Sequence, residues 1–235
     1  MDYSAITYIT IPEGAVTHIH QAGTLLWKRQ GLPSGYQQLA YIETSGSQYI
    51  DTEVMASNYP EGLSYKFRGQ FYGFKQSSGN NYLFGCLNSG KRSGNICADT
   101  RASANPLSLF IGASGSQIFG AEAPTAGTDF ELTLTCVSTD PDNAVPALNG
   151  TPFTYVTSGA GCPMPEATIY LLHCSGVGST SKPFWGRLYS FSISTPNGTP
   201  IRAFVPCCRI SDNAIGLYDT VEGKFYTNAG TGSFM

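Results

Sequence analysis

The sequence predicts an all-β protein, in which two antiparallel sheets pack as a sandwich behind a short N-terminal β segment. Three observations lead to this fold class. Only 12% of the 235 residues are charged, against roughly a quarter in an average soluble chain. Turn-forming and aromatic residues are abundant, with 27 Gly, 14 Pro, 14 Tyr and 13 Phe. Apolar and polar residues alternate with a period of two, which is typical of half-buried strands and not of helices.

The same composition excludes several classes of protein. The net charge of −3 gives no electrostatic basis for binding a nucleic-acid polyanion. No apolar run reaches the roughly 18 residues that a membrane-spanning helix requires. A hydrophobic share of 41% is too high for a disordered chain. We therefore expect a β-rich protein that has neither a nucleic acid nor a membrane as its partner.

The chain begins Met1-Asp2-Tyr3-Ser4 and runs directly into a strand pattern, without the basic and apolar regions of a secretory signal peptide. We therefore expect it to fold in a bacterial cytoplasm. The cysteines lie mostly in apolar strand patterns, and their number is odd. Free thiols are the simpler interpretation, and a disulfide framework is the alternative. The seven are Cys86, Cys97, Cys136, Cys162, Cys174, Cys207 and Cys208.

The first 30 residues are interpreted as a small β leader. Strands are expected at residues 3–11, 16–20 and 24–28, separated by Gly-containing turns. Three short strands bury little surface by themselves, so the leader should pack on another part of this chain or on another chain. The Gly- and Pro-containing residues 31–35 then form a linker. We place the leader at residues 1–31 and the sandwich at residues 32–235.

From residue 32 onward, strand patterns follow one another with turn clusters between them, as in a sandwich or barrel. Residues 188–193 alternate aromatic or aliphatic side chains with Ser, which gives that strand one buried and one polar face. The clearest strands are predicted at residues 40–44, 48–52, 63–74, 82–87, 107–111, 130–138, 168–174, 187–195, 201–206, 215–219 and 224–227.

Two longer motifs at opposite ends of this region make it recognisable. Residues 32–52, and residues 204–207 with 216–228, resemble concanavalin A-like (laminin-G-like) β-sandwich domains. Such domains occur in structural proteins of phages and prophages of gut bacteria and in bacterial surface proteins. Residues 11–16 and 25–28 look like the short leader that precedes these domains in phage proteins.

The resemblance implies a jelly-roll of two curved antiparallel sheets, often with a glycan bound on a concave face or at loop tips. It transfers no binding residue to this chain, because the shared motifs read as structural.

No catalytic pattern is present, so we predict neither an enzyme nor a cofactor. Glycoside hydrolases of this fold carry Glu-x-Asp-x-x-Glu on one strand, and no Glu in this chain is followed two residues later by Asp. The carboxylate pairs Asp51/Glu53 and Asp129/Glu131 lack a third acid and are interpreted as solvated strand edges. A Gly-x-Ser-x-Gly nucleophile turn is also absent.

Residues 85–92 come within one residue of a phosphate-binding loop. That loop needs Ser or Thr after its Lys and a helix behind it, whereas here Arg92 follows Lys91. We interpret the segment as a hairpin loop. Asn88 and Arg92 are then candidates for contacting a sugar from its tip.

Exposed aromatic rings are the other candidates for binding a carbohydrate, because a ring face can stack on a pyranose. Trp185 stands at the start of a strand, where a core position is the alternative. Tyr59, Tyr72 and Tyr82 lie near predicted loops and are comparable candidates. Trp27 follows two leucines and is expected to anchor the leader.

His18 and His20 fall on one face of a predicted strand. Two imidazoles are too few to hold a metal ion alone, so we predict no metal site in a single chain. In a trimer, three such pairs would meet at the axis and offer six nitrogens. An exposed pair on a polar face is the alternative.

We interpret the chain as a phage or prophage virion protein whose sandwich binds a receptor or host-surface glycan. The leader, with Ile9, Ile11, Leu26 and Trp27, is expected to contact other virion proteins or further copies of the chain, with a trimer favoured. Packing of the leader on its own sandwich is the alternative. Other functions that fit are a purely structural head fibre or capsid decoration, a bacterial surface adhesin and a glycan-degrading enzyme.

Overall fold

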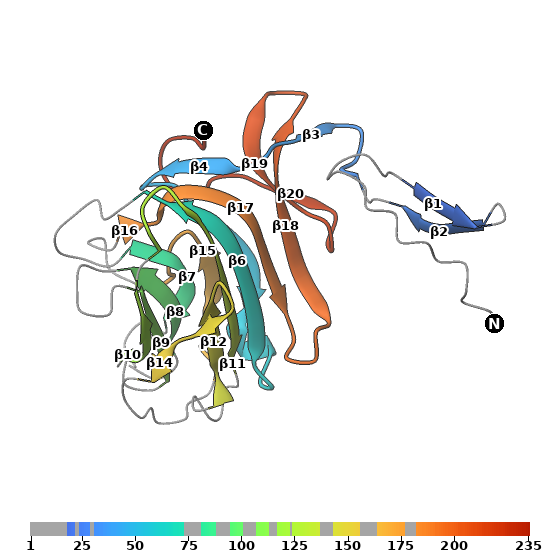
Figure 1. Cartoon of the computed structure of the whole chain (residues 1–235). Helices are drawn as coiled ribbons and strands as arrows, with labels where there is room; N and C mark the ends of the chain where they lie inside the picture. The colour runs from blue at the N-terminus through green and yellow to red at the C-terminus, as the bar shows by residue number, and fades with distance from the viewer. Residues whose placement is uncertain are drawn as a thin grey trace. The chain divides into compact units, whose positions relative to one another are not determined.

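The computed structural model describes residues 18–21, 24–28, 31–72, 81–87, 95–100, 107–112, 117–122, 124–136, 143–155, 164–176 and 182–235 (Figure 1). The chain divides into two compact units, Met1–Pro33 and Ser34–Met235. This division falls within the predicted linker, close to the boundary expected after residue 31.

In the first unit, β1 (His18–Gln21) and β2 (Thr24–Lys28) form an antiparallel hairpin. Two of the three strands predicted for the leader are therefore confirmed. The register shifts between Ile19 and His20, so the hairpin contains a β-bulge. The strand predicted at residues 3–11, which carries Ile9 and Ile11, lies outside the described residues.

The second unit contains two large sheets. The first has eight strands in the order β14-β10-β9-β8-β7-β15-β5, with β16 parallel to β7. Its strands are β5 (Ile50–Met55), β7 (Asn81–Leu87), β8 (Asn95–Thr100), β9 (Leu107–Gly112), β10 (Gln117–Ala121), β14 (Thr154–Tyr155), β15 (Thr168–Leu171) and β16 (Lys182–Pro183).

The second sheet has ten strands in the order β13-β12-β11-β6-β17-β18-β19-β20, with β4 beside β17 and β3 beside β18. Its strands are β3 (Tyr36–Gln38), β4 (Ile42–Ser45), β6 (Leu63–Phe71), β11 (Asp129–Cys136), β12 (Val145–Leu148), β13 (Thr151–Pro152), β17 (Trp185–Ser194), β18 (Pro200–Arg209), β19 (Ala214–Asp219) and β20 (Lys224–Tyr226).

The two sheets form the two layers of a sandwich, as Figure 1 shows with β7 and β8 in one layer and β6 and β17 in the other. Along β6 every second residue is buried, because alternate side chains of a strand point to opposite faces. Tyr65 of β6 stacks on Phe84 of β7 with ring centroids 4.8 Å apart, and Phe84 also contacts Phe191 of β17 at 5.3 Å. The predicted all-β, two-sheet antiparallel fold is confirmed.

Strand β17 has two different neighbours along one edge. Its second half pairs with β18, while its first half pairs with β4, with Leu188 opposite Ile42. Strand β18 in turn pairs with β3 through its last residues. Strands β17 and β18 therefore pair with each other over only part of their length. The rest of β17 pairs with β4, and the end of β18 pairs with β3.

The C-terminal residues close the sandwich against its first strands. Glu43 and Met235 exchange two backbone hydrogen bonds, of 2.7 and 3.1 Å. The Gln48 side chain, 3% exposed, donates to the carbonyl of Ser233 at 3.0 Å. The two sequence motifs that carried the family resemblance lie side by side in space, because Cys207 of β18 pairs with Gln38 of β3.

The predicted strands are confirmed in position, but several differ in length. The strand expected at residues 63–74 ends at Phe71, and the one expected at 201–206 spans Pro200–Arg209. Residues 168–174 were expected to form one strand, but β15 ends at Leu171. Leu172 adopts a left-handed backbone with φ of 68°, which turns the chain out of the sheet. Ser175 then runs parallel to Cys86 of β7.

Among the described residues, Ala56–Asn58 form the short 3₁₀ turn η1. None of the described residues forms a helix with the length and apolar character needed to cross a membrane. Cys86, Cys174 and Cys207 are buried, and Cys208 is partly exposed. The adjacent Cys207 and Cys208 do not form a disulfide.

Candidate functional site

The outer face of the ten-stranded sheet carries a group of aromatic and charged side chains at the start of β17. Trp185, Arg187 and Tyr189 alternate with the buried Gly186 and Leu188, so all three point away from the core. Their neighbours come from β4, from the residue before β4 and from the residue after β6. The sheet-face cluster consists of Tyr41, Glu43, Tyr72, Trp185, Arg187 and Tyr189.

Gly186 allows β17 to approach β6 closely at this point. Its φ is +155°, and a Cβ there would lie only 2.0 Å from the backbone oxygen of Gln70. No other residue fits this position without moving one strand. The flanking Trp185 and Arg187 are consequently held directly beside the end of β6.

Glu43 is at the centre of the cluster. The Tyr72 hydroxyl donates to its Oε2 at 2.8 Å, and Arg187 Nε donates to the same oxygen at 3.0 Å. The ring of Tyr72 also meets that of Trp185 edge-on, with centroids 5.8 Å apart. Glu43 and Arg187 have 25% and 32% of their side chains exposed, so the pair is accessible to a ligand.

Arg187 connects this pair to two further tyrosines. Its guanidinium carbon lies 4.1 Å from the centre of the Tyr41 ring, which is a cation–π contact. Tyr41 and Tyr189 meet edge-on at 6.2 Å, and the Tyr189 hydroxyl donates to Oδ1 of Asp129 at 2.7 Å. Four strands of one sheet are therefore joined by side chains on its outer surface.

The hydrogen bonds determine the charges of the cluster. The Tyr72 hydroxyl holds the pKa of the Glu43 carboxyl below its ordinary value, and Arg187 adds to this effect. Burial, together with the hydrogen bond to Glu43, raises the pKa of Tyr72 to about 12. At neutral pH Glu43 is ionised, Tyr72 is neutral and Arg187 balances the carboxylate.

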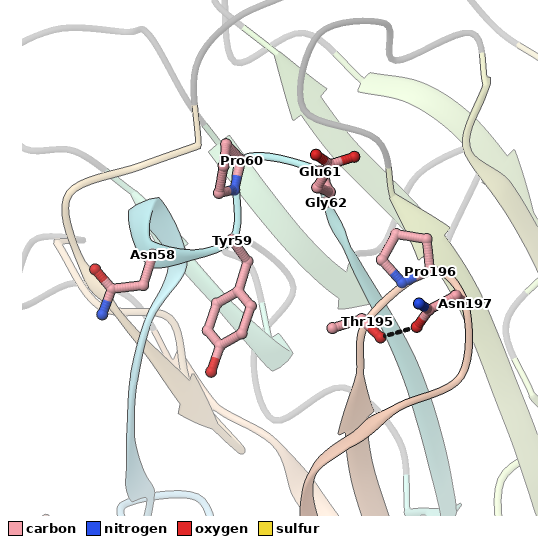
Figure 2. Close-up of a pocket in the computed structure, with 8 residues that line it drawn as sticks. All are labelled: Asn58, Tyr59, Pro60, Glu61, Gly62, Thr195, Pro196 and Asn197. Atoms are coloured by element: carbon pink, nitrogen blue, oxygen red, sulfur yellow. Dashed lines mark hydrogen bonds between the residues drawn. The ribbon is translucent and has the colours of Figure 1, made fainter.

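A pocket of about 320 Å³ lies elsewhere on the sandwich and contains Tyr59 (Figure 2). One wall is formed by residues 58–62, which follow η1 and lead into β6. The other wall is residues 195–197, in the turn between β17 and β18. Figure 2 shows the ring of Tyr59 between Asn58 and Thr195.

The structure brings together two of the residues selected from the sequence, Tyr72 and Trp185, and places Tyr59 in the pocket. The choice of Tyr82 is corrected. Tyr82 is only 6% exposed, packs with Cys174 and stacks on His173 with centroids 6.2 Å apart. Such an enclosed ring has no face to offer to a sugar.

The other selected residues are not placed in a site. Asn88 and Arg92 lie outside the described residues, as do Ile9 and Ile11. The remaining candidates of the leader are on its two described strands: His18 and His20 on β1, Leu26 and Trp27 on β2. Within the described residues, no group of three or more His, Cys, Asp or Glu side chains could hold a metal ion.

Tyr41, Glu43, Arg187 and Tyr189 were not selected from the sequence. A signal was present, because Tyr41 and Glu43 are two positions apart, as are Trp185, Arg187 and Tyr189. A spacing of two places side chains on one face of a strand. The pairing of β4 with β17, which unites the two sets, is not visible in the sequence.

The two carboxylate pairs of the sequence have structural partners. Glu53 pairs with Lys224, and Asp51 Oδ1 accepts a hydrogen bond from the Glu53 backbone N–H at 2.9 Å. Glu131 pairs with Lys66 at 3.0 Å. Asp51 and Glu53 lie on β5, an edge strand, as expected. The expectation was wrong for Asp129 and Glu131, because β11 is an inner strand that pairs with both β12 and β6.

No family model matches the chain, and no curated protein matches it. Among solved structures, it is similar to a SAP-like pentraxin from Limulus polyphemus, with 13% identity over 65% of this chain and 74% of that one and a TM-score of 0.47. The Ruminococcus gnavus IT-sialidase CBM40 also has 13% identity and a TM-score of 0.47, over 67% of this chain and 90% of the other.

Domains LG4-5 of the mouse laminin alpha1 chain show 13% identity and a TM-score of 0.45, over 86% of this chain and 52% of theirs. Similarity at this level says nothing about what this chain binds.

Proposed function

We propose that this chain is a phage or prophage virion surface protein whose β-sandwich binds a host-surface glycan. The observation that carries the glycan-binding part is the sheet-face cluster, in which Tyr72 and Trp185 lie beside an accessible Glu43–Arg187 pair. The virion part is supported by the family resemblance and by the β leader at the N-terminus.

The cluster has the chemistry that a sugar ring requires. Aromatic side chains present an apolar body next to a polar group, and sugars carry apolar C–H faces next to hydroxyls. In the described residues, the hydrogen bonds of Glu43 use only Oε2, so Oε1 remains as an acceptor. The bond from Arg187 uses Nε, and the planar guanidinium carries further donors at its two terminal nitrogens. One acceptor beside two donors suits a pair of neighbouring hydroxyls.

A second feature favours binding over mere surface decoration. Glu43 and Arg187 are held in place by Tyr72 and Tyr41 before any ligand arrives. Side chains that are already ordered lose little conformational entropy on binding, which improves affinity.

Binding to a glycan array and to surface polysaccharides of gut bacteria tests this part of the proposal. Trp185→Ala and Arg187→Ala should each weaken binding at least about tenfold, a loss of roughly 1.4 kcal/mol. Tyr170→Ala is the matched control, because Tyr170 is a half-buried tyrosine on the other sheet. Equal binding by Trp185→Ala and the control would show that the cluster is not the site.

The virion part needs a separate experiment. Antibodies against the sandwich should label particles induced from the host, and immunoelectron microscopy would give their position on the particle. Label on the bacterial envelope in the absence of particles would instead indicate an adhesin.

A purely structural decoration protein is the second candidate function. It is favoured by the pairing within the cluster, where Glu43 is bonded to both Tyr72 and Arg187 and stabilises contacts between strands. In that case labelled particles would bind no glycan, and Trp185→Ala would change only the thermal stability of the sandwich.

A further inference from the structure

We propose that the Tyr59 pocket is a second binding site, specific for a single neutral sugar residue at the end of a glycan chain. The proposal rests on the proposed glycan-binding function but concerns a different place. The pocket is beyond the C-terminal end of β17, whereas Trp185 begins that strand. Ten residues of strand span about 30 Å, so the two sites are independent.

The size of the pocket limits what it can hold. Its volume of about 320 Å³ is at the lower end of the range of about 300–1,000 Å³ that is usual for small-molecule sites. A single pyranose fits this space, whereas a longer oligosaccharide would have to extend out of it. The site therefore recognises a terminal residue, in contrast to the open sheet face.

Both walls are held by hydrogen bonds within the protein. In the first, the Tyr59 N–H donates to Ala56 O at 3.0 Å and the Gly62 N–H to Tyr59 O at 2.9 Å. Pro60 lies between them and restricts the backbone further. Gly62 has a φ of 103°, a left-handed conformation that favours glycine and lets the wall turn into β6.

The second wall is built around the side chains of Thr195 and Asn197. Thr195 Oγ1 donates to Asn197 Oδ1 and accepts the N–H of Thr199 at 3.0 Å. The hydroxyl of Thr199 donates to the same Asn197 oxygen at 3.1 Å. Asn197 Oδ1 thus faces into the turn, and its amide Nδ2 remains as a hydrogen-bond donor.

The side chains that face the pocket combine an apolar ring with uncharged donors. Tyr59 is half-buried and packs against the core, and its hydroxyl has no hydrogen-bond partner among the described residues. Its ring can cover the C–H face of a sugar while the hydroxyl and the Asn197 amide contact the sugar oxygens.

Charge then selects the class of sugar. Glu61 is exposed and supplies the charged group of the described lining, with no lysine or arginine beside it. A carboxylate or sulfate on the ligand would be placed against this negative charge with nothing to compensate it. The pocket therefore favours neutral hexoses and N-acetylhexosamines over uronic and sialic acids.

The test measures the binding of a panel of monosaccharides to the whole protein by two-dimensional NMR. The neutral arm contains galactose, glucose, mannose and N-acetylglucosamine, and the acidic arm contains glucuronic acid and N-acetylneuraminic acid. At least one neutral sugar should shift the amide signals of Gly62 and Asn197. Tyr59→Ala should raise the dissociation constant of that sugar at least about tenfold, and Tyr59→Phe should raise it less.

Two variants separate this proposal from the preceding one. Trp185→Ala should leave monosaccharide binding unchanged, and Tyr59→Ala should leave polysaccharide binding at the sheet face unchanged. Glu61→Gln should allow acidic sugars to bind more tightly without abolishing the binding of neutral sugars. The pocket proposal is overturned if no neutral sugar shifts those amide signals, or if Tyr59→Ala binds as well as the unmodified protein. If Trp185→Ala abolished monosaccharide binding and Tyr59→Ala did not, the pocket proposal would be overturned and the sheet-face site would be retained.

Discussion

The backbone N–H of Tyr49 donates a hydrogen bond of 3.0 Å to Oδ1 of Asn228, although the two residues are 179 positions apart. The same oxygen accepts the N–H of Gly230 at 2.8 Å, and Asn228 Nδ2 donates to the carbonyl of Gly232 at 2.8 Å. One amide side chain thus fixes the C-terminal segment to the start of β5. The hydrogen bonds of Asn228 therefore join the N-terminal and C-terminal parts of the sandwich.

Deleting residues 213–235 should therefore unfold more than the deleted part. The deletion removes β19, β20 and the segment that pairs with Glu43 and Ser47. It exposes core residues such as Phe204, which is 1% exposed in the whole chain. We expect an insoluble or molten product without near-UV circular dichroism. An intact near-UV spectrum would contradict the prediction.

Asp219→Ala should be strongly destabilising. Asp219 is fully buried, accepts the N–H groups of Ala203 and Val221 at 2.8 and 3.0 Å, and lies 3.4 Å from Arg202 Nε. Removing the carboxylate takes the acceptor away from two backbone N–H groups, and a hydrogen bond to a charged group contributes about 1.5–3 kcal/mol. Arg202 keeps its second partner, Glu222 Oε2, at 3.2 Å. Urea denaturation measures the loss of unfolding free energy.

Asp212→Ala is the matched control for this measurement. Asp212 pairs with Arg209 at 2.7 Å, but 49% of its side chain is exposed. Exposed ion pairs contribute at most about 1 kcal/mol. Equal losses in the two variants would show that burial of Asp219 is not what makes it important.

Tyr72→Phe should change the acid titration of Glu43. The Tyr72 hydroxyl is the largest cause of the lowered pKa of the Glu43 carboxyl, so its removal should raise that pKa toward the ordinary value. A carboxyl whose pKa is lower in the folded state stabilises the fold above its unfolded pKa, and this contribution is lost as the pH falls. The variant should therefore lose less stability on acidification. NMR titration of the Glu43 side chain measures the pKa directly.

At alkaline pH, the contribution of Tyr72 to stability has the opposite pH dependence. The folded-state pKa of Tyr72, about 12, lies above its ordinary value of 10.0, so its contribution to stability is complete below pH 10 and is lost as the pH rises toward 12. Absorbance at 295 nm should show one late-ionising tyrosine fewer in Tyr72→Phe. An unchanged titration would place Tyr72 outside the hydrogen-bonded cluster.

The seven cysteines should all be alkylated under denaturing, non-reducing conditions, as mass spectrometry can determine. In the native protein their reactivities should differ. Burial raises the pKa of Cys207 to about 12, with a further effect from Cys208, so Cys207 forms no thiolate at pH 8. Cys208 is partly exposed and should react with a thiol reagent before the buried Cys86, Cys174 and Cys207. A persistent disulfide would contradict the prediction.

Removing residues 1–30 should leave a folded, soluble monomer that no longer assembles. Burying two large apolar side chains contributes several kcal/mol at about 25 cal/mol per Å², which is enough to hold an attachment. Light scattering gives the mass of both forms. Assembly by the shortened chain would indicate that the leader is not the contact. The apolar residues of the leader are Ile6, Ile9, Ile11, Ile19, Leu25, Leu26 and Trp27.

The strands were predictable because the sheets are buried on one face, which forces a period of two on the sequence. The positions of β6, β11 and β17 follow from that pattern alone. The end of β15 does not, because it depends on the left-handed backbone of Leu172, a residue with no local preference for that conformation. The long-range order of the strands is also absent from any local pattern.

The candidate sites were predictable only in part. Trp185 was selected at the start of a strand and Tyr72 and Tyr59 near loops, and all three are at least partly exposed. Tyr82 met the same criterion, but the chain that reverses after Leu172 brings His173 onto its ring. Glu43 gained its partners only because β4 pairs with β17. Contacts between distant strands decide which surface residues act together.

The insertion of β4 beside β17 also determines when the protein can fold during its synthesis. Glu43 and Arg187 are separated by 144 positions, so β4 leaves the ribosome long before its partner strand exists. Fold completion must wait for β17 through β20 to be translated, and closing such long loops makes folding slow. Throughout that interval the early strands expose unpaired edges to other nascent chains, a situation that favours aggregation. In a cell that produces many copies at once, unfinished chains would be the species most exposed to this aggregation.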